Sequence, residues 1–202
     1  MNNSDRPVAH HSFMEKLIAY LLQFGNLTEG DISVLTNKFQ VLHLQKEGYL
    51  SKAGKVPKQV GFIISGVIRM FNYNDQGDEV TTYFIDENRL VVDYARFESG
   101  AVAPDYLQAA TDCTVLIIDK KDWDALFDLI PAWRELVNNA VKHAFQIHLE
   151  RRTSLVTENA KDRYLSFLKQ FPMLANRVSQ THIASYLGIT RFSLSRIRKS
   201  IR

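Results

Sequence analysis

The last quarter of the chain holds the residues with the clearest chemistry. Residues 179–201 read SQTHIASYLGITRFSLSRIRKSI, and two arginines in this stretch, Arg191 and Arg196, lie five positions apart. An arginine can donate two hydrogen bonds to O6 and N7 of guanine in the major groove of DNA, which admits one α-helix. We therefore expect a helix that starts near residue 191 to read base edges with these two side chains, which we place near one face of it.

Residues 179–201 also have the pattern of two helices joined by a tight turn. Ser179 and Thr190 are placed to cap the two helices, because their side-chain oxygens accept hydrogen bonds from free backbone N–H groups. Gly188 permits a left-handed backbone in the turn, and Ala184 leaves room where the helices cross. The pattern predicts a helix-turn-helix with these inward-facing residues: Ile183, Ala184, Leu187, Leu194 and Ile197.

Further side chains complete the expected nucleic-acid interface. Hydroxyl and amide groups at helix N-termini suit phosphate oxygens, and the lysine near the end of the second helix adds attraction that does not depend on sequence. Phe192 has two interpretations, contact with a thymine methyl group or packing against the preceding helix. The candidate DNA-binding residues are Arg191, Arg196, Phe192, Ser193, Ser195, Lys199, Thr190, Ser179, Gln180 and Thr181.

Charge is distributed unevenly along the 202 residues, although the total is only +3. Residues 151–202 hold 11 Lys and Arg against 2 Asp and Glu, a net charge of +9. Residues 1–150 hold 14 against 20, a net charge of −6. Like charges concentrated in a short segment repel each other unless a polyanion binds them, so double-stranded DNA is the expected partner of this segment. The alternative is an ordinary solvated face.

The residues before the basic segment predict strands flanked by helices. Helical periodicity covers 13–24, and Thr28 is placed to cap a second helix that continues through Lys38. Between residues 39 and 119, apolar runs separated by turn residues predict about eight strands, among them VTTYFI, RLVVDYA and TVLIID, with a hairpin turn at 74–78. Strands at this spacing favour a jelly roll, so the expected fold class is α+β.

A long helix is predicted from Pro131 to about residue 153. Its apolar residues recur every three and four positions, and small residues in the middle of this stripe would let a second helix approach closely. We interpret the stripe as a dimer seam, and the alternative is packing on the chain's own sheet. The seam residues are Trp133, Leu136, Val137, Ala140, Ala144 and Ile147. The expected domains are a β-roll sensor over 1–130, a dimerisation helix over 131–155 and a helix-turn-helix domain over 156–202.

Composition disfavours other classes of function. The longest apolar run, residues 60–68, is far shorter than the ~20 residues of a membrane span, and the polar N-terminus lacks the order of a secretory signal, so we expect a cytoplasmic protein. The single cysteine, Cys113, can neither form an intrachain disulfide nor hold an iron–sulfur cluster. The six histidines show no paired ligand spacing. We therefore expect no metal, no cofactor and no enzyme activity.

From about Phe13 to Ile201 the chain resembles the Crp/Fnr family of transcription regulators. The resemblance rests on the order of N-terminal helices, strands that contain GFIISGVIRMF, a long helix and the segment LGITRFSLSRIRKSI. It implies a cyclic-nucleotide-binding-type β-roll and a homodimer that reads a two-fold symmetric operator, with half-sites about one helical turn apart. It also implies RNA polymerase as a partner.

The resemblance locates an effector pocket at which this chain departs from the family. Members that bind cyclic nucleotides carry a Gly-Glu pair for the ribose and, about ten residues later, an arginine and a backbone N–H for the phosphate. Val92 and Asp93 stand at the first place here, and Ala103 and Pro104 at the second. Neither Ala nor Pro can replace the charge-assisted bond of arginine, so we expect no binding of cyclic AMP in the usual manner. An unidentified small-molecule effector stays open, as does the alternative of a cyclic-nucleotide-binding module that acts on a partner protein.

Overall fold

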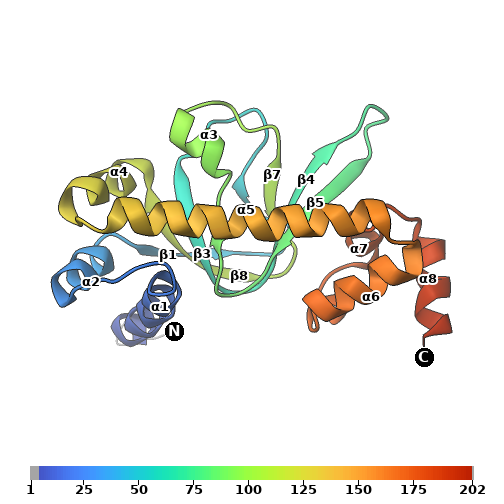
Figure 1. The fold of residues 1–202 in the computed structure, drawn as a ribbon, viewed down its shortest axis with the longest axis horizontal. Helices are drawn as coiled ribbons and strands as arrows, with labels where there is room; N and C mark the ends of the chain where they lie inside the picture. The colour runs from blue at the N-terminus through green and yellow to red at the C-terminus, as the bar shows by residue number, and fades with distance from the viewer. Residues whose placement is uncertain (1–4, 202) are drawn as a thin grey trace.

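The computed structural model describes residues 5–201, with the side chains of 5–8 and 150–156 left aside. Two helices precede a body of strands, and further helices follow it (Figure 1). The first elements are α1 (Asp5–Leu21), α2 (Glu29–Thr36), β1 (Gln40–Leu44), β2 (Tyr49–Ser51), β3 (Gln59–Ser65), β4 (Ile68–Tyr73), β5 (Glu79–Ile85) and β6 (Leu90–Val91). The later ones are α3 (Tyr94–Ser99), β7 (Tyr106–Ala109), β8 (Cys113–Asp119), α4 (Lys120–Leu129), α5 (Trp133–Thr157), α6 (Ala160–Gln170), the 3-10 turn η1 (Leu174–Asn176), α7 (Gln180–Tyr186) and α8 (Arg191–Ser200).

The strands form two four-stranded sheets with antiparallel pairing. Sheet A has the order β1-β8-β3-β6, and sheet B has the order β2-β7-β4-β5. The hairpin between β4 and β5 turns at Gly77, which has a φ of +84°, and the side-chain oxygen of Asn74 accepts a hydrogen bond from the N–H of Asp78 at 2.8 Å. The predicted α+β fold with a roll of short strands is confirmed, and we call residues 40–119 the roll.

One predicted strand is shorter than the sequence suggests. Of the run RLVVDYA, only Leu90 and Val91 pair as a strand, and the rest leads into α3. The cause is local, because the side chain of Asp93 accepts a hydrogen bond from the backbone N–H of Arg96 at 3.3 Å and so caps a helix. The apolar pattern of the run therefore reflects burial beside a helix start as well as strand pairing.

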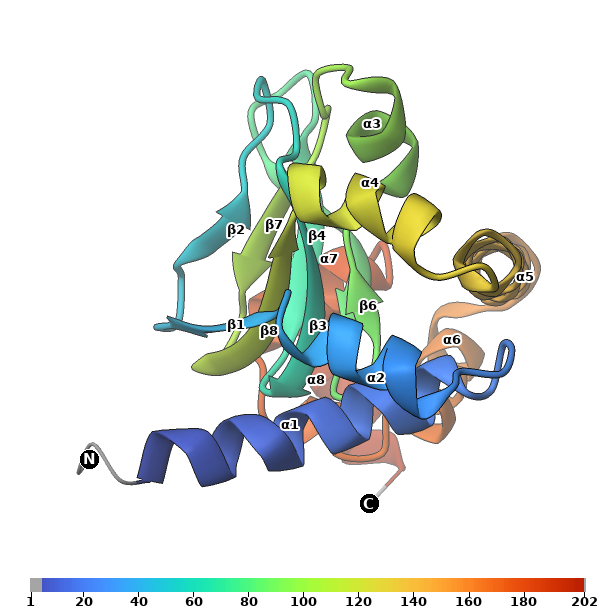
Figure 2. The same ribbon diagram turned by 90° about the vertical axis from the view of Figure 1, so that its left-hand side faces the viewer.

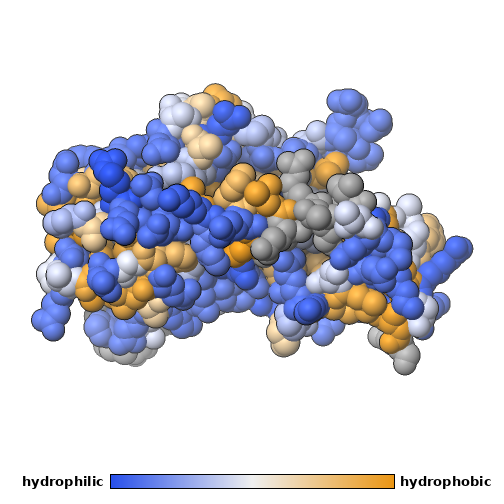
Figure 3. Space-filling view, viewed as in Figure 1, coloured by the Kyte–Doolittle hydropathy of each residue, from blue (hydrophilic) through white to orange (hydrophobic). Residues whose placement is uncertain are grey.

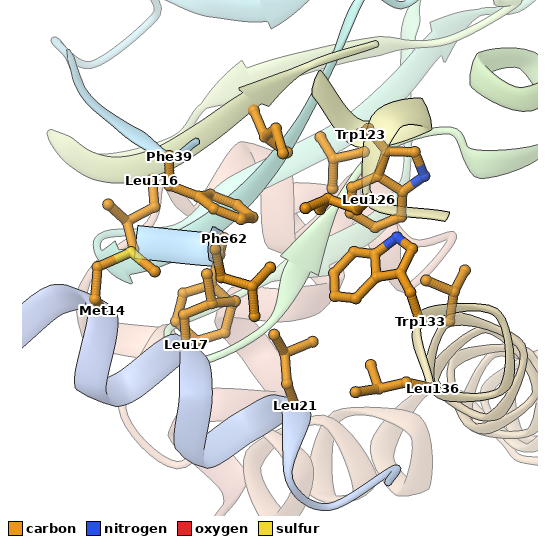
Figure 4. Packing of buried hydrophobic residues seen from close by; sticks show 14 of the residues in the cluster. Met14, Leu17, Leu21, Phe39, Phe62, Leu116, Trp123, Leu126, Trp133 and Leu136 are labelled. Carbon is orange, nitrogen blue, oxygen red and sulfur yellow. The ribbon is translucent and has the colours of Figure 1, made fainter. Parts of the chain in front are cut away.

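The largest hydrophobic cluster lies between sheet A and the helices packed on it (Figure 4). Phe62 and Leu116 of sheet A and Leu17 of α1 are fully buried. Trp133, at the start of α5, packs edge-on against Trp123 of α4, with ring centroids 5.1 Å apart. Figure 2 shows α1 and α2 below the strands and α5 beside them, seen end-on. This core fixes the first turns of α5 to the roll.

The helices that follow α5 share a second hydrophobic cluster with the roll. We call residues 158–201, which comprise α6, η1, α7 and α8, the C-terminal unit. Its cluster includes Val67, Phe84 and Ala110 of the roll. The ring of Phe84 lies 5.3 Å from that of Tyr186 and 6.4 Å from that of Phe171, measured between centroids. The C-terminal unit is therefore packed against the outer face of sheet B.

Gly66, between β3 and β4, generates a testable prediction about the roll. It has a φ of +102°, and a Cβ atom at this position would collide with the carbonyl oxygen of Asp112 and with Cys113. Gly66→Ala should lower the free energy of unfolding by about 3 kcal/mol, because backbone strain and overpacking add. Gly77→Ala is the matched control, since Gly77 also has positive φ but has no atom within 4 Å of the added Cβ. It should cost about 1 kcal/mol. Equal losses in urea unfolding of the two variants would contradict the packing described for Gly66.

Candidate nucleic-acid interface and effector cavity

Helices α7 and α8 are joined by the tight turn that the sequence predicts. The side-chain oxygen of Ser179 accepts a hydrogen bond from the backbone N–H of His182 at 3.2 Å, and that of Thr190 accepts one from Ser193 at 3.1 Å. Gly188 has a φ of +64°, a left-handed conformation that glycine takes without steric cost. Both predicted caps and the predicted turn are confirmed.

The inner faces of the two helices pack as the spacing predicts. Ile183, Leu187 and Leu194 are fully buried or nearly so, and Ile197 is half-buried. Ala184, with 2% of its surface exposed, lies in the same cluster. This packing leaves the opposite side of α8 open to solvent.

The open side of α8 forms a continuous face. Successive residues of an α-helix are rotated by about 100°, so Arg191 and Arg196 stand about 140° apart, at the two edges of the exposed arc. Phe192, Ser195 and Lys199 fall between these edges, and all five side chains are exposed. The prediction placed the two arginines near one face of the helix, whereas the structure separates them. They border the face, and we call these five residues the recognition face.

The exposure of Phe192 decides between the two interpretations given for this residue. Phe192 is 83% exposed, which excludes packing against the preceding helix. The hydroxyl groups of Thr190 and Ser193 lie 3.1 Å apart and hydrogen-bond to each other in addition to forming the cap. The remaining predicted contacts occupy the N-termini of the two helices, where Gln180, Thr181 and Thr190 are exposed and Ser179 and Ser193 are half-buried.

The long helix α5 buries most of the predicted dimer seam within its own chain. Trp133 and Leu136 are fully buried, and Val137 and Ala140 are each 4% exposed. Trp133, Leu136 and Val137 belong to the cluster under sheet A, and Ala140 lines the adjoining cavity. The prediction that these four residues meet a second chain is contradicted by their burial, and the alternative of packing on the chain's own sheet holds for them.

A cavity of about 490 Å³ lies between α5 and the roll. Its wall is mostly apolar and aromatic, and it includes Tyr20 of α1, Met70 of β4 and Tyr83 of β5. Ala144 and Ile147, the last two predicted seam residues, also line it. The inward stripe of α5 thus continues from a packed core into the roof of a cavity.

Polar groups line one part of this cavity. Glu87 and Arg89 come from the segment between β5 and β6, and His143 and His148 come from α5. Arg89 forms an ion pair with Asp86, at 2.8 Å between its Nε and a carboxylate oxygen. No motif links these four residues, because they meet only when α5 crosses the roll.

The four residues predicted for the effector pocket have different environments. Of the four, Val92 lines the cavity, Asp93 caps α3 and Pro104 is exposed. The backbone N–H of Ala103, where the family holds a phosphate, donates to the carbonyl oxygen of Lys55 at 2.9 Å. Since this donor already has a partner, the position offers neither an arginine nor a free N–H to a cyclic phosphate.

An ion pair joins the C-terminal unit to the roll. The guanidinium of Arg177 donates two hydrogen bonds to the carboxylate of Glu87, at 2.9 and 2.5 Å, and the backbone N–H of Gly66 donates to the same carboxylate at 2.8 Å. Burial raises the pKa of Glu87, but the bonds from Arg177 and Gly66 outweigh it and hold the pKa below its ordinary value. Sequence analysis missed this pair, because no motif or periodicity links residues 90 positions apart.

Comparison with known proteins agrees with this architecture. Residues 41–129 match the family described as the cyclic nucleotide-binding domain. Over 167 residues the chain is 28% identical to the fumarate and nitrate reduction regulatory protein of Vibrio cholerae. This match covers 76% of the chain but 65% of that protein, so the chain spans slightly less than two thirds of the length of this relative.

Solved structures share the fold over most of the chain. FixK2 from Bradyrhizobium japonicum has a TM-score of 0.70 at 16% identity, covering 81% of this chain and 84% of its own. A structure from Eubacterium rectale, assigned to the crp/fnr family of transcriptional regulators, has a TM-score of 0.67 at 15% identity, covering 86% and 83%. The fold and the interface thus define a cyclic nucleotide-binding-type roll joined to a helix-turn-helix. The chain shares this fold with a structure assigned to the crp/fnr family.

Two observations concern other functions. Within residues 5–201, no group of three or more His, Cys, Asp or Glu side chains is arranged to hold a metal ion. None of the helices in this part of the chain combines the length and the apolar character that crossing a bilayer requires. The Vibrio cholerae relative is named a regulatory protein and the Eubacterium rectale structure a transcriptional regulator, in agreement with the prediction of no enzyme activity for this chain.

His182, at the contact between α7 and the roll, gives a prediction about pH. Burial lowers its pKa below the ordinary value of 6.5, and the positive charge of Arg69 lowers it further. The unfolded chain therefore binds a proton on this residue at a higher pH than the folded chain does, and stability is lost as the pH falls below about 6.5. Urea unfolding at pH 7.5 and 5.5 should show a larger loss for the natural protein than for His182→Gln. The same loss in both would show that another group causes it.

Proposed function

We propose that this chain is a DNA-binding transcription regulator of the Crp/Fnr type that binds a palindromic operator as a homodimer. The observation that carries the proposal is the recognition face of α8, which is open to solvent on a capped helix-turn-helix. A single α-helix fits the major groove, and the unit that presents this helix lies in the basic part of the chain. The regulatory names of the relatives support the same conclusion.

The arrangement of the recognition face suggests how a base sequence would be read. Arg191 and Arg196, at the two edges, reach different base pairs, and each can hold a guanine by two hydrogen bonds. Phe192, exposed between them, is suited to contact a thymine methyl group. Gln180 and Thr181, exposed at the start of α7, are placed for phosphate contacts that orient the unit on the duplex.

The second part of the proposal concerns the effector. We propose that the cavity under α5 is the altered effector site and that it does not take cyclic AMP in the usual manner. Supporting this are the paired backbone N–H of Ala103, the exposed Pro104 and the largely apolar, aromatic wall. Arg89 lines this cavity, but its guanidinium is already paired with Asp86, so a cyclic phosphate would have to compete for it, and burying the phosphate without such a partner is costly.

Four of the six predicted seam residues are buried within the chain, which favours a dimer contact on another face of α5. The side of α5 that points away from the roll carries Phe145 and Leu149, which are 60% and 47% exposed. Figure 3 shows hydrophobic residues near the middle of this side of the molecule, among hydrophilic neighbours. We propose that a second copy of the chain covers this outer face of α5, in place of the four buried seam residues.

The test of DNA binding removes the arginines that border the recognition face. Arg191→Ala together with Arg196→Ala should weaken binding to a palindromic duplex, selected from a random pool with the natural protein, by about 1–3 kcal/mol per arginine. Fluorescence anisotropy of the labelled duplex, over a series of salt concentrations, measures the loss.

The control for this experiment removes the same charge far from α8. Lys58→Ala together with Lys121→Ala takes two exposed positive charges from the roll and from α4, at the other end of α5 (Figure 1). This variant should bind the selected duplex within about twofold of the natural protein, because surface charges far from the contact add little. Failure of the natural protein to enrich any duplex, or equal binding by the arginine variant, would refute the proposed function.

The dimer contact is tested by Phe145→Glu. A charge at this position would have to be desolvated in a helix–helix contact, so dimerisation measured by sedimentation equilibrium should weaken at least tenfold. Leu22→Glu, which alters another exposed apolar residue just after α1, should leave it unchanged. A natural protein that sediments as a monomer, or a Phe145→Glu variant that dimerises normally, would rule out this face.

A further inference from the structure

The contact between the C-terminal unit and the roll carries an inference about how the recognition face is oriented. A helix-turn-helix attached only through α5 would be free to swing about its link, and two copies could then meet half-sites at many separations. Here the unit is packed on sheet B and is held by polar contacts at two separate places. The inference deepens the proposed function and rests on it.

The first polar contact is the pair between Arg177 and Glu87. Arg177 follows η1 and lies two residues before the cap of α7, so its side chain fixes the entry to the helix-turn-helix. Both side chains are about one third exposed, and the two hydrogen bonds run in parallel from guanidinium to carboxylate. A bidentate pair of this kind restrains direction as well as distance.

The second contact ties the end of α7 to β5. The hydroxyl of Ser185 accepts a hydrogen bond from the backbone N–H of Thr81 and donates one to the carbonyl oxygen of Glu79, both at 2.9 Å. It thus satisfies two backbone groups at the edge of sheet B, since β5 is the last strand of that sheet. The first helix of the helix-turn-helix is therefore held at both of its ends.

Beneath this contact lies a rigid polar support. Arg69 of β4 is 2% exposed, and its guanidinium donates to the side chains of Gln108, Glu79 and Thr81. It also stacks over the ring of Phe71, 3.9 Å from the centroid. Because every partner of Arg69 comes from sheet B, these contacts hold the strands on which α7 packs. The roll therefore sets the position of α7.

Besides contacting Arg177 and Gly66, Glu87 borders the cavity under α5. Glu87, Asn88 and Arg89 all line that cavity. Asn88 has a φ of +60°, and two backbone hydrogen bonds hold the segment to Ile63 of β3, at 2.8 and 3.0 Å. A short, pinned segment thus faces the cavity on one side and the C-terminal unit on the other.

We propose that Glu87 is a positioning residue for DNA recognition. Through Arg177 it fixes the orientation of α7 and α8 on the roll, so that the two recognition faces of a dimer meet half-sites at one spacing. Glu87 touches no DNA in this account and acts only through Arg177. Loosening the pair widens the range of spacings that the dimer accepts, while the chemistry of each recognition face stays the same.

The experiment compares two duplexes. One is the palindrome selected by the natural protein, and the other carries one additional base pair between its half-sites. Glu87→Gln keeps an acceptor for the N–H of Gly66 but removes the charge that holds Arg177. The natural protein should prefer the first duplex, and in Glu87→Gln this preference should shrink by about fivefold or more, the usual lower range of coupling between sites.

The ratio of the two affinities is the deciding readout, because a change of net charge or a partial loss of stability alters both duplexes alike. Asp124→Asn is the matched control, since it removes a carboxylate from an ion pair with Lys120 on α4 and should leave the ratio unchanged. The exchanged pair, Glu87→Arg with Arg177→Glu, should regain at least part of the preference. An unchanged ratio in Glu87→Gln overturns the proposal.

Hydrogen exchange separates this proposal from the proposed function. In Glu87→Gln the amides of η1 and α7 should exchange at least fivefold faster, while those of β3 and β8 keep their natural rates. If the natural protein binds no duplex, the proposed function fails, yet unchanged exchange in η1 and α7 would still refute the role of Glu87 independently. Faster exchange throughout the roll would show general destabilisation and would also overturn it.

Discussion

The packing of Phe84 against the C-terminal helices is the contact on which the rest of the arrangement depends. A unit of 158–201 is near the size at which a chain can no longer bury enough apolar surface by itself. Phe84, with Val67 and Ala110, supplies the missing wall from the roll, and the rings of Phe167 and Tyr186 close on it. The helix-turn-helix is thus stabilised by the same sheet that forms the cavity, and the two parts of the protein share structure.

The long helix α5 has three roles that use different parts of its surface. Its first turns must hold the helix to the roll, and they do so through Trp133 and Leu136. Further along, the same stripe becomes the roof of a cavity because small and medium side chains, Ala144 and Ile147, replace large ones. The outer face keeps the exposed Phe145 for another chain. One helix therefore carries an anchor, a cavity wall and a candidate dimer contact on different parts of its surface.

Sequence reasoning succeeded where the cause of the structure is local. The caps at Thr28, Ser179 and Thr190 and the positive φ of Gly188 are decided by side-chain and backbone preferences within a few residues. Periodicity likewise placed most of the strands and the buried face of the helix-turn-helix, because burial follows the repeat of each element. The exposure of Phe192 was left open between two interpretations, since the period of a helix says which side a residue faces but not what the neighbouring helix covers.

Sequence reasoning failed where a structural feature depends on contact between residues far apart in the chain. An apolar stripe on α5 has the same period whether a sheet or a second helix covers it, so the period could not show that the first four seam residues are buried by their own chain. The pair of Glu87 and Arg177 and the polar part of the cavity depend on how the C-terminal unit settles on the roll, which no motif records. The predicted strand at residues 89–95 is shorter in the structure for a different reason, because Asp93 caps a helix that starts inside this apolar run.

The opposite charges of the two parts of the chain have a consequence for how the molecule approaches a polyanion. The basic C-terminal unit hangs at one end of α5, and the acidic remainder surrounds the other end (Figure 1). Such a separation gives the molecule a permanent electric dipole along its long axis. In the field of a polyanion the dipole experiences a torque that turns the basic end forward, while the acidic end is repelled. The molecule is therefore oriented before it contacts the polyanion, with its basic end leading. Approaches in other orientations become rarer, most strongly at low salt, because salt screens the interaction.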